Sequence, residues 1–173
     1  ILQRNELSDR ALRLTATCLY MNPANYSVWH FRRLCLDAVY QDASSLSHAL
    51  LADLELAASL GGDNPKNYQI WYHRRALLER LSDSLSASHV GAELEYIDTV
   101  MAIDGKNYHA WSHRQWVIST FNKDEVWKQE LKNADLLIGK DVRNNSAWNH
   151  RWFISHRGKQ GDESILSAET AAA

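Results

Sequence analysis

The chain has 173 residues, of which 45% are hydrophobic and 23% charged, as in ordinary folded domains. Its formal net charge is −2, from 19 Lys and Arg against 21 Asp and Glu, so no overall positive charge draws it to nucleic acid or to an anionic membrane. The sequence shows no signal peptide and no apolar run of about 18 residues, so we expect a soluble, cytoplasmic protein without membrane insertion. Cys18 and Cys35 lack metal-ligand spacing and are expected to be structural free thiols.

The sequence predicts two kinds of helix that alternate along the chain. Apolar residues at three-and-four spacing predict the first kind at 7–21, 46–60, 91–103 and 126–139. Turn-forming residues mark the links at 61–65, 82–88 and 156–163, and no strand is expected. One hairpin cannot bury its own apolar face, so the predicted fold is all-α: a right-handed α–α superhelix (solenoid) of antiparallel hairpins, forming one helical-repeat domain over residues 1–173.

The second kind of helix opens on a motif present in four copies: NYSVWHFRR at 25–33, NYQIWYHRR at 67–75, NYHAWSHRQ at 107–115 and NNSAWNHRW at 144–152. Their central Trp residues are 42, 40 and 37 residues apart, in the range of helical-hairpin repeats. An Asn or Asp precedes each motif by three residues, and we expect it to be the N-cap, with Pro23 and Pro65 at the first helical position. The repeats are therefore predicted to open near 22, 64, 104 and 141.

The shared Trp, Arg and His residues of the motif are predicted to be scaffold, since a ligand site would not be needed four times. Trp29, Trp71, Trp111 and Trp148 are expected in the core, with the motif Tyr on the same face three residues earlier. The Arg three residues after each Trp is expected to reach a carboxylate or carbonyl of the neighbouring repeat. The His just before that Arg, at 73, 113 and 150, is expected to pack or to hydrogen-bond between repeats.

This repeat resembles that of the protein prenyltransferase alpha subunits, whose signature is Pro-x-Asn-Tyr-x-x-Trp-x-x-Arg-Arg in tandem helical hairpins. Segments 23–33 and 65–75 match it outright, and the later copies look like the successive repeats of the alpha subunit shared by protein farnesyltransferase and type I geranylgeranyltransferase. The resemblance covers residues from about 6 to 156. Family members carry further repeats, and segment 164–173 reads as the start of another helix, so a fragment of a longer subunit is expected.

The resemblance implies an obligate heterodimer with a prenyltransferase beta subunit that holds the catalytic zinc. It further implies attack of a zinc-bound cysteine thiolate, from a substrate with a C-terminal CaaX motif, on C1 of farnesyl or geranylgeranyl diphosphate, with departure of diphosphate. Magnesium is added as a companion of the diphosphate. No metal site is expected in this chain, because its eight His are spread one or two to a repeat without a Cys/His cluster at zinc spacing.

The resemblance also assigns roles to six residues at the start of the second and third motifs. Lys66 would approach the diphosphate, Tyr68 would line the pocket near it, and Asn107, Tyr108 and His109 would border the same region. Gln69 would hydrogen-bond the carboxylate terminus of the substrate peptide. Lys66, Tyr68 and His109 are therefore the predicted catalytic residues, and Gln69, Asn107 and Tyr108 the predicted substrate-binding residues.

Independent reasoning supports part of this assignment. A leaving diphosphate needs cations and donors, and Lys66 and Lys106 both lie where a motif helix opens and its N–H groups are free. Gln69 and His109 differ from Ser27 and Ser146 at the same repeat position, so repeat geometry does not require them.

Two other functions remain open from the sequence. One is the alpha subunit of the Rab-modifying geranylgeranyltransferase, which is similar but less close. The other is a non-catalytic interaction scaffold like the tetratricopeptide proteins, although their repeats hold close to about 34 residues and lack the motif described above. The choice between farnesyl and geranylgeranyl is expected to be made by the beta subunit.

Overall fold

The computed structural model describes residues 6–62, 64–121 and 124–157, and the predicted helix start at 164–173 lies outside them. The chain divides into two compact units, residues 1–85 and 86–173, which we call the first and the second unit. The described residues contain eight α-helices and no strand, which confirms the predicted all-α class.

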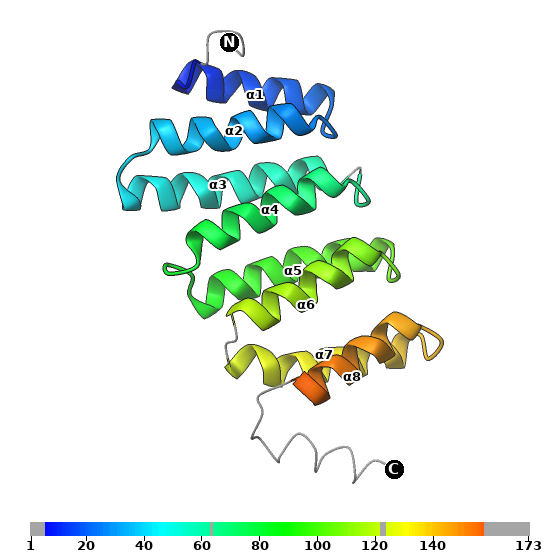
Figure 1. Cartoon of the computed structure of the whole chain (residues 1–173). Helices are drawn as coiled ribbons and strands as arrows, with labels where there is room; N and C mark the ends of the chain where they lie inside the picture. Colours follow the sequence, from blue (N-terminus) through cyan, green and yellow to red (C-terminus); the bar gives the residue numbers. More distant parts are fainter. Residues whose placement is uncertain (1–5, 63, 122–123, 158–173) are drawn as a thin grey trace. The chain divides into compact units, whose positions relative to one another are not determined.

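The first unit consists of two helical hairpins (Figure 1). Helix α1 (Asp9–Met21) packs against α2 (Tyr26–Val39), and α3 (Ala43–Gly61) packs against α4 (Tyr68–Leu81). Helix α2 also contacts α3 and α4, so the second helix of one hairpin joins it to the next. A buried cluster lies at this junction and is formed by Leu19, Trp29, Ala57, Leu60 and Ile70.

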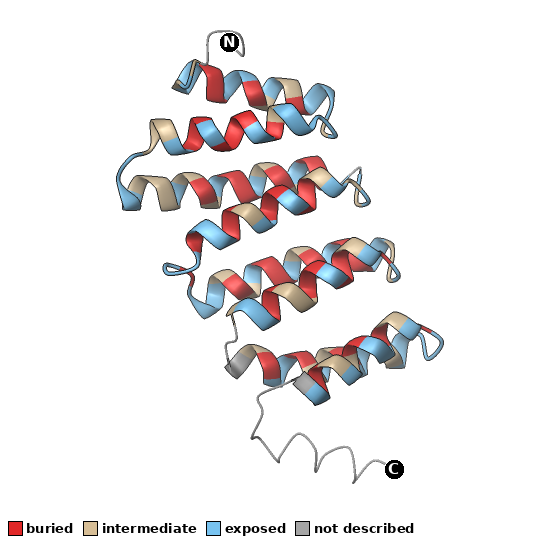
Figure 2. Ribbon diagram, in the orientation of Figure 1, coloured by how far each residue is buried: buried red, intermediate tan, exposed pale blue. Residues whose placement is uncertain are grey.

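The second unit repeats the same plan. Helix α5 (Ala87–Ile103) packs against α6 (Tyr108–Phe121), and α7 (Asp124–Lys140) packs against α8 (Asn145–Arg157). The two hairpins meet through α5 with α7 and α6 with α8. Helices α1, α3, α5 and α7 overlap the predicted segments 7–21, 46–60, 91–103 and 126–139. In each unit the buried residues form stripes that face the neighbouring helices (Figure 2).

The motif helices are capped by the shared Asn, and the predicted caps three residues earlier are wrong. The Oδ1 atoms of Asn25 and Asn107 accept the backbone N–H groups of Val28 (3.2 Å) and Ala110 (3.1 Å). Asn67 and Asn144 accept in the same way, from Gln69 (2.9 Å) and Ser146 (3.0 Å). A first-turn N–H that has no partner within the helix is thereby satisfied in every copy.

The residues predicted as caps instead build the turn between the two helices of a hairpin. Asn22 ends α1, and its Oδ1 accepts the N–H of Ala24 (3.0 Å). Asp104 and Asp141 accept the N–H two residues further on in the same way. The chain must reverse within a few residues here, and Asn and Asp side chains stabilise such turns. Pro23 and Pro65 consequently lie in the turn, before the helix begins.

Three of the four motif Trp residues are in the core, as predicted. Trp29 is fully buried, Trp71 and Trp111 are 5% and 6% exposed, and each donates its indole N–H to the carbonyl six residues earlier. Trp148 makes the same bond to Val142 but is 45% exposed, so the prediction is wrong for this residue. The imidazoles of His73 and His150 cover Trp29 and Trp111 at 4.3 and 5.1 Å, and no hairpin follows α8 in the described residues to cover Trp148.

The motif Tyr residues do not share the buried face with Trp. Tyr26, Tyr68 and Tyr108 are 57%, 60% and 77% exposed. Residues three apart on a helix differ by about 60° around the axis, so Tyr lies at the edge of the apolar stripe when Trp lies at its centre. These rings are therefore available to a ligand or a partner.

Candidate functional site

The predicted residues of the second repeat lie together where α4 begins. Lys66 is exposed in the turn, and Tyr68 and Gln69 are the first two residues of the helix. The Tyr68 ring stacks on Tyr72, with centroids 6.2 Å apart and planes at 18°. This end of the first unit thus presents an ammonium group, a phenol and a carboxamide beside the positive end of a helix dipole.

The predicted residues of the third repeat lie at the equivalent place in the second unit, where α6 begins. Asn107 is 1% exposed, and its Oδ1 is used in capping the helix. Tyr108 is exposed and His109 is half-buried, with their rings edge to face at 5.8 Å. The six predicted residues therefore form two groups of three, one in each unit, both at the N-terminal end of a motif helix.

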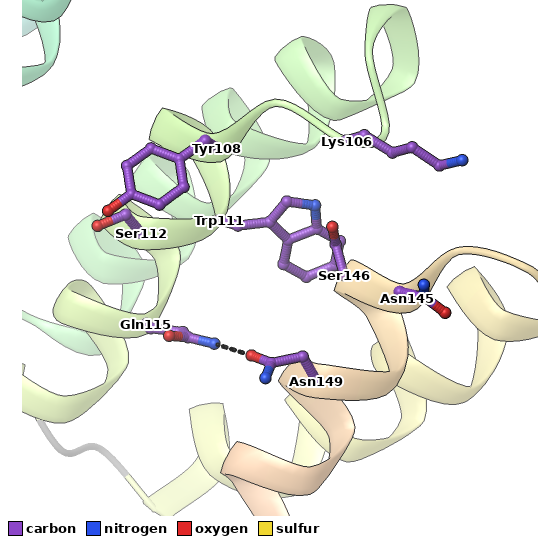
Figure 3. Close-up of a pocket in the computed structure, with 8 residues that line it drawn as sticks. All are labelled: Lys106, Tyr108, Trp111, Ser112, Gln115, Asn145, Ser146 and Asn149. Carbon is purple, nitrogen blue, oxygen red and sulfur yellow. Dashed lines mark hydrogen bonds between the residues drawn. The ribbon is translucent and has the colours of Figure 1, made fainter.

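A pocket of about 360 Å³ lies between α6 and α8 of the second unit (Figure 3). It is lined by Lys106, Tyr108, Trp111, Ser112, Gln115, Asn145, Ser146 and Asn149. Across it, Gln115 Nε2 donates to Asn149 Oδ1 at 3.5 Å (Figure 3). Of the six predicted residues, only Tyr108 lines this pocket. The sequence reasoning missed its small polar residues, although the replacement of the motif Tyr by Asn145 was a signal.

Buried carboxylates bind the motif Arg and His residues inside the first unit. Asp53 of α3, 2% exposed, accepts from Arg32 Nε (2.7 Å) and Nη2 and lies 2.8 Å from His73 Nε2. The other ring nitrogen, His73 Nδ1, lies 3.2 Å from Arg33 Nη1. Because arginine only donates, Nδ1 accepts and Nε2–H donates to Asp53. This Arg–carboxylate–His relay joins α2 to the hairpin that follows it.

The second unit contains the same relay. Glu130 of α7, 2% exposed, accepts from Arg114 Nε (2.7 Å) and Nη2 (2.5 Å) and lies 2.9 Å from His150 Nε2. Arg114 also donates to Asp98 of its own hairpin at 2.7 Å. Contacts of Arg32 and Arg114 with the following hairpin confirm the prediction for these two arginines. Arg74 and Arg151 donate to Leu54 O and Asp135 within their own hairpins, each at 2.7 Å.

The predicted packing of the motif His residues between repeats is confirmed for His73 and His150. His73 and His150 pack on a Trp of the preceding hairpin and bond a carboxylate, and His113 Nε2 lies 2.8 Å from Glu93 Oε1. The three carboxylates, Asp53, Glu93 and Glu130, each precede their His by 20 residues. Sequence reasoning missed them, although an acid recurring inside an apolar helix stripe is the signal that could have found them.

The relays shift the pKa values of their members. Burial would raise the pKa of Glu130, but the bonds from Arg114 and His150 outweigh it and lower that pKa to about 2. The pKa of Asp53 is lowered for the same reason, by His73 and Arg32 against its burial. Burial lowers the pKa of His73 despite its bond to Asp53. At neutral pH the relays therefore hold two ionised carboxylates, and His73 is neutral.

Three further observations concern the described residues. No group of three His, Cys, Asp or Glu side chains in this part of the chain could hold a metal ion. None of the helices the structure describes is long and apolar enough to cross a membrane. Cys18 and Cys35 are free thiols, as predicted, and burial raises the pKa of Cys35.

Together these features define a helical-repeat protein in which the same buried relay joins the two hairpins of each unit and the predicted site residues lie where the motif helices begin. The chain belongs to the protein prenyltransferase alpha subunit repeat family, whose model matches residues 8–39, 50–81, 90–121 and 127–157. Each family repeat thus contains one helix of each kind, and the turns at 22, 64, 104 and 141 lie inside the repeats.

Matches to individual proteins are more specific than the match to the family. The chain is 46% identical over 59 residues to the protein farnesyltransferase/geranylgeranyltransferase type-1 subunit alpha of Arabidopsis thaliana, a match covering 34% of this chain and 16% of that protein. It is 57% identical over 37 residues to the protein of the same name from Pisum sativum, covering 21% of this chain and 11% of that protein.

Among solved structures, a chain of the Candida albicans protein geranylgeranyltransferase-I complexed with GGPP matches with a TM-score of 0.79 and 27% identity. The match covers 97% of this chain and 54% of that chain, so the present chain spans about half the length of its solved relative.

Proposed function

We propose that this chain is part of the alpha subunit of a heterodimeric protein prenyltransferase. The enzyme transfers a farnesyl or geranylgeranyl group from its diphosphate to the cysteine of a C-terminal CaaX motif. The observation that carries the proposal is the 46% identity to an Arabidopsis type-1 subunit alpha, within a chain whose four repeats all match the alpha-subunit family. This relationship favours the type I enzymes over the Rab-modifying enzyme and over a non-catalytic scaffold.

In this proposal, the residues at the start of α4 bind the two reacting partners. The Lys66 ammonium attracts the diphosphate, whose negative charge grows as the bond to the isoprenoid breaks. The adjacent helix end adds a favourable dipole, and the Tyr68 hydroxyl supplies a donor. The Gln69 carboxamide donates to the carboxylate terminus of the substrate peptide.

The residues at the start of α6 border the same substrates. Tyr108 and His109 offer a hydroxyl and an imidazole as donors to the diphosphate. Asn107 is buried and caps α6, which fixes the backbone that carries both of these side chains. These roles rest on family resemblance, and the exposure of Tyr68 and Tyr108 supports them.

The partner in this proposal is a prenyltransferase beta subunit, which binds the zinc ion. When bound, zinc lowers the pKa of the substrate thiol, so that the cysteine reacts as a thiolate. Magnesium accompanies the diphosphate. The protein acts in the cytoplasm on CaaX-terminated proteins.

The test is reconstitution of the enzyme. The full-length protein and a beta subunit from the same organism are coexpressed, and transfer of isoprenoid to a CaaX peptide is measured for the complex and for each chain alone. The proposal predicts that the two chains copurify with zinc and that only the complex is active. A stable complex that transfers neither isoprenoid would contradict it, as would failure of the two chains to associate.

A further inference from the structure

The turn that leads into α6 is held in place by bonds to its backbone. It comprises residues 104–106 and is followed directly by the predicted site residues of the third repeat, 107–109. Within the same hairpin, the indole N–H of Trp111 donates to the carbonyl of Gly105 at 2.9 Å. This bond recurs in all four motifs, so it belongs to the repeat and does not set the third copy apart.

A second bond reaches the same carbonyl from the following hairpin. Asn144, the residue before α8, is 7% exposed, and its Nδ2 donates to Gly105 O at 2.9 Å. Its Oδ1 accepts the backbone N–H of Ser146 at 3.0 Å, which caps α8. The two ends of this carboxamide cannot be exchanged, because Oδ1 faces N–H groups and Nδ2 faces a carbonyl. One buried side chain therefore caps α8 and joins the turn before α6 to the next hairpin.

The first unit shows that the cap and the bond to the turn are separate features. Asn67 caps α4 as Asn144 caps α8, and Trp29 donates to Pro23 O at 2.7 Å. Within the described part of the chain, however, Asn67 makes no hydrogen bond to Pro23 O. Capping needs only the side-chain oxygen, so it does not account for the bond made by Asn144 Nδ2. The turn without this second bond leads into α2, where no site residue is predicted, and the turn with it leads into α6, where three are predicted.

The side chains at the start of α6 depend on this backbone for their position. The Tyr108 ring is 77% exposed and lines the α6–α8 pocket (Figure 3). An exposed side chain has few packing contacts, so the backbone that carries it largely decides where its polar atom lies. Misplacing a reacting or positioning group by about 1 Å can cost about 100-fold in rate. A bond that fixes the turn before Tyr108 and His109 therefore bears on the rate of the reaction.

We propose that Asn144 is a positioning residue for prenyl transfer. By donating to Gly105 O from the following hairpin, it fixes the turn that presents Tyr108 and His109 to the isoprenoid diphosphate. Asn144 acts through these two residues and contacts no substrate itself. The inference rests on the proposed function, since it takes Tyr108 and His109 to be donors to the diphosphate.

The test removes the bond to the turn and keeps the cap. Asn144→Asp retains an oxygen that caps α8 and replaces the N–H donor by a second oxygen, and Asp caps a helix about as well as Asn. Asn144→Ser also caps, carries no charge and is one bond too short to replace Nδ2. The matched control is Asn25→Asp, at an exposed cap whose side chain bonds the N–H of Val28 in its own helix. All variants are made in the full-length protein assembled with the zinc-bearing beta subunit.

We expect both Asn144 variants to lower kcat for isoprenoid transfer about tenfold, because the donors to the leaving diphosphate are displaced. The KM for the CaaX peptide is expected to stay within about twofold, since Gln69 of the first unit binds the peptide carboxylate. The melting temperature is expected to stay unchanged, and Asn25→Asp is expected to behave as wild type. Wild-type kcat in both Asn144 variants would overturn the proposal. A lowered melting temperature together with a raised KM would also overturn it, because Asn144 would then only hold the fold.

A second measurement asks whether Asn144 acts through the two donors. In the background Tyr108→Phe/His109→Ala, adding Asn144→Asp is expected to lower kcat by less than about twofold, because the groups it positions are already gone. A further tenfold loss, on the order of that in the wild-type background, would contradict the proposal. If Tyr108→Phe/His109→Ala transfers isoprenoid as fast as wild type, or the wild-type complex transfers none, it is the proposed function that fails.

Discussion

The two units are joined internally by the same contacts and differ in the side chains between their motif helices. In both, an Arg of one hairpin and a His of the next meet on a buried carboxylate, Asp53 in the first unit and Glu130 in the second. In the first unit, the Arg33 guanidinium lies over the Tyr72 ring between the motif helices α2 and α4, whereas in the second unit the equivalent residues, Gln115 and Asn149, line a pocket. Contacts that recur provide cohesion, and positions that change between units are candidates for binding.

The largest expected difference concerns the motif Trp residues. Trp29→Ala is expected to lower the free energy of unfolding by about 4 kcal/mol, because it removes a fully buried ring from the junction of two hairpins. Trp148→Ala, at a ring that is 45% exposed, is expected to cost about 1 kcal/mol. Urea unfolding of the purified chain measures both. Equal losses of unfolding free energy would show that the difference in burial between Trp29 and Trp148 does not determine how much each ring stabilises the fold.

The second-largest effects are expected for substitutions of the relay carboxylates. Asp53→Asn is expected to cost about 3 kcal/mol, because it leaves the buried guanidinium of Arg32 without its carboxylate. Glu130→Gln is expected to cost less, about 2 kcal/mol, because Asp98 still pairs with Arg114 at 2.7 Å. The same unfolding experiment, with Asp135→Asn as an exposed control, compares them. A greater loss of unfolding free energy for Glu130→Gln than for Asp53→Asn would contradict this ranking.

Acid is expected to weaken the relays in two stages. The folded pKa of His73 lies below its ordinary value of 6.5, so its contribution is present above pH 6.5 and is lost as the pH falls below it. Glu130 has a folded pKa of about 2 against 4.5, so its contribution, on the order of 3 kcal/mol, is present above pH 4.5 and is lost toward pH 2. Unfolding free energies from pH 7 to 3 test this, with His73→Gln expected to remove the first stage. A profile that is flat above pH 4.5 would contradict the assignment to His73.

The repeat unit could be predicted well because its signals are local and recur. The four aligned Trp residues and the spacing of apolar residues predicted the hairpins and their order. They also predicted the burial of Trp29, Trp71 and Trp111. The cap was misplaced because Asn22 and Asn25 are both good capping residues, and the geometry of the reversing turn decides between them. The exposure of Trp148 was missed because it depends on which helices cover the residue, and no local signal carries that information.

The candidate site was predictable only in part. Lys66, Tyr68, Gln69, Asn107, Tyr108 and His109 came from family resemblance, and their roles stay predictions. The relay acids were missed because a single acid in an apolar helix becomes meaningful only when its Arg and His partners are found on other helices. The α6–α8 pocket was missed for a related reason, since it depends on side-chain volumes compared between two hairpins.

The central claim is that residues at the start of the motif helices act on substrate while the recurring Trp, Arg and His residues hold the fold. The most direct measurement is prenyl transfer by the full-length protein assembled with its beta subunit, comparing Lys66→Ala with Lys128→Ala, an exposed lysine of α7. We predict that Lys66→Ala lowers the rate of transfer at least about tenfold, an effect of roughly 1.4 kcal/mol on the barrier, while the melting temperature stays unchanged. Equal rates for wild type and both variants would contradict the account.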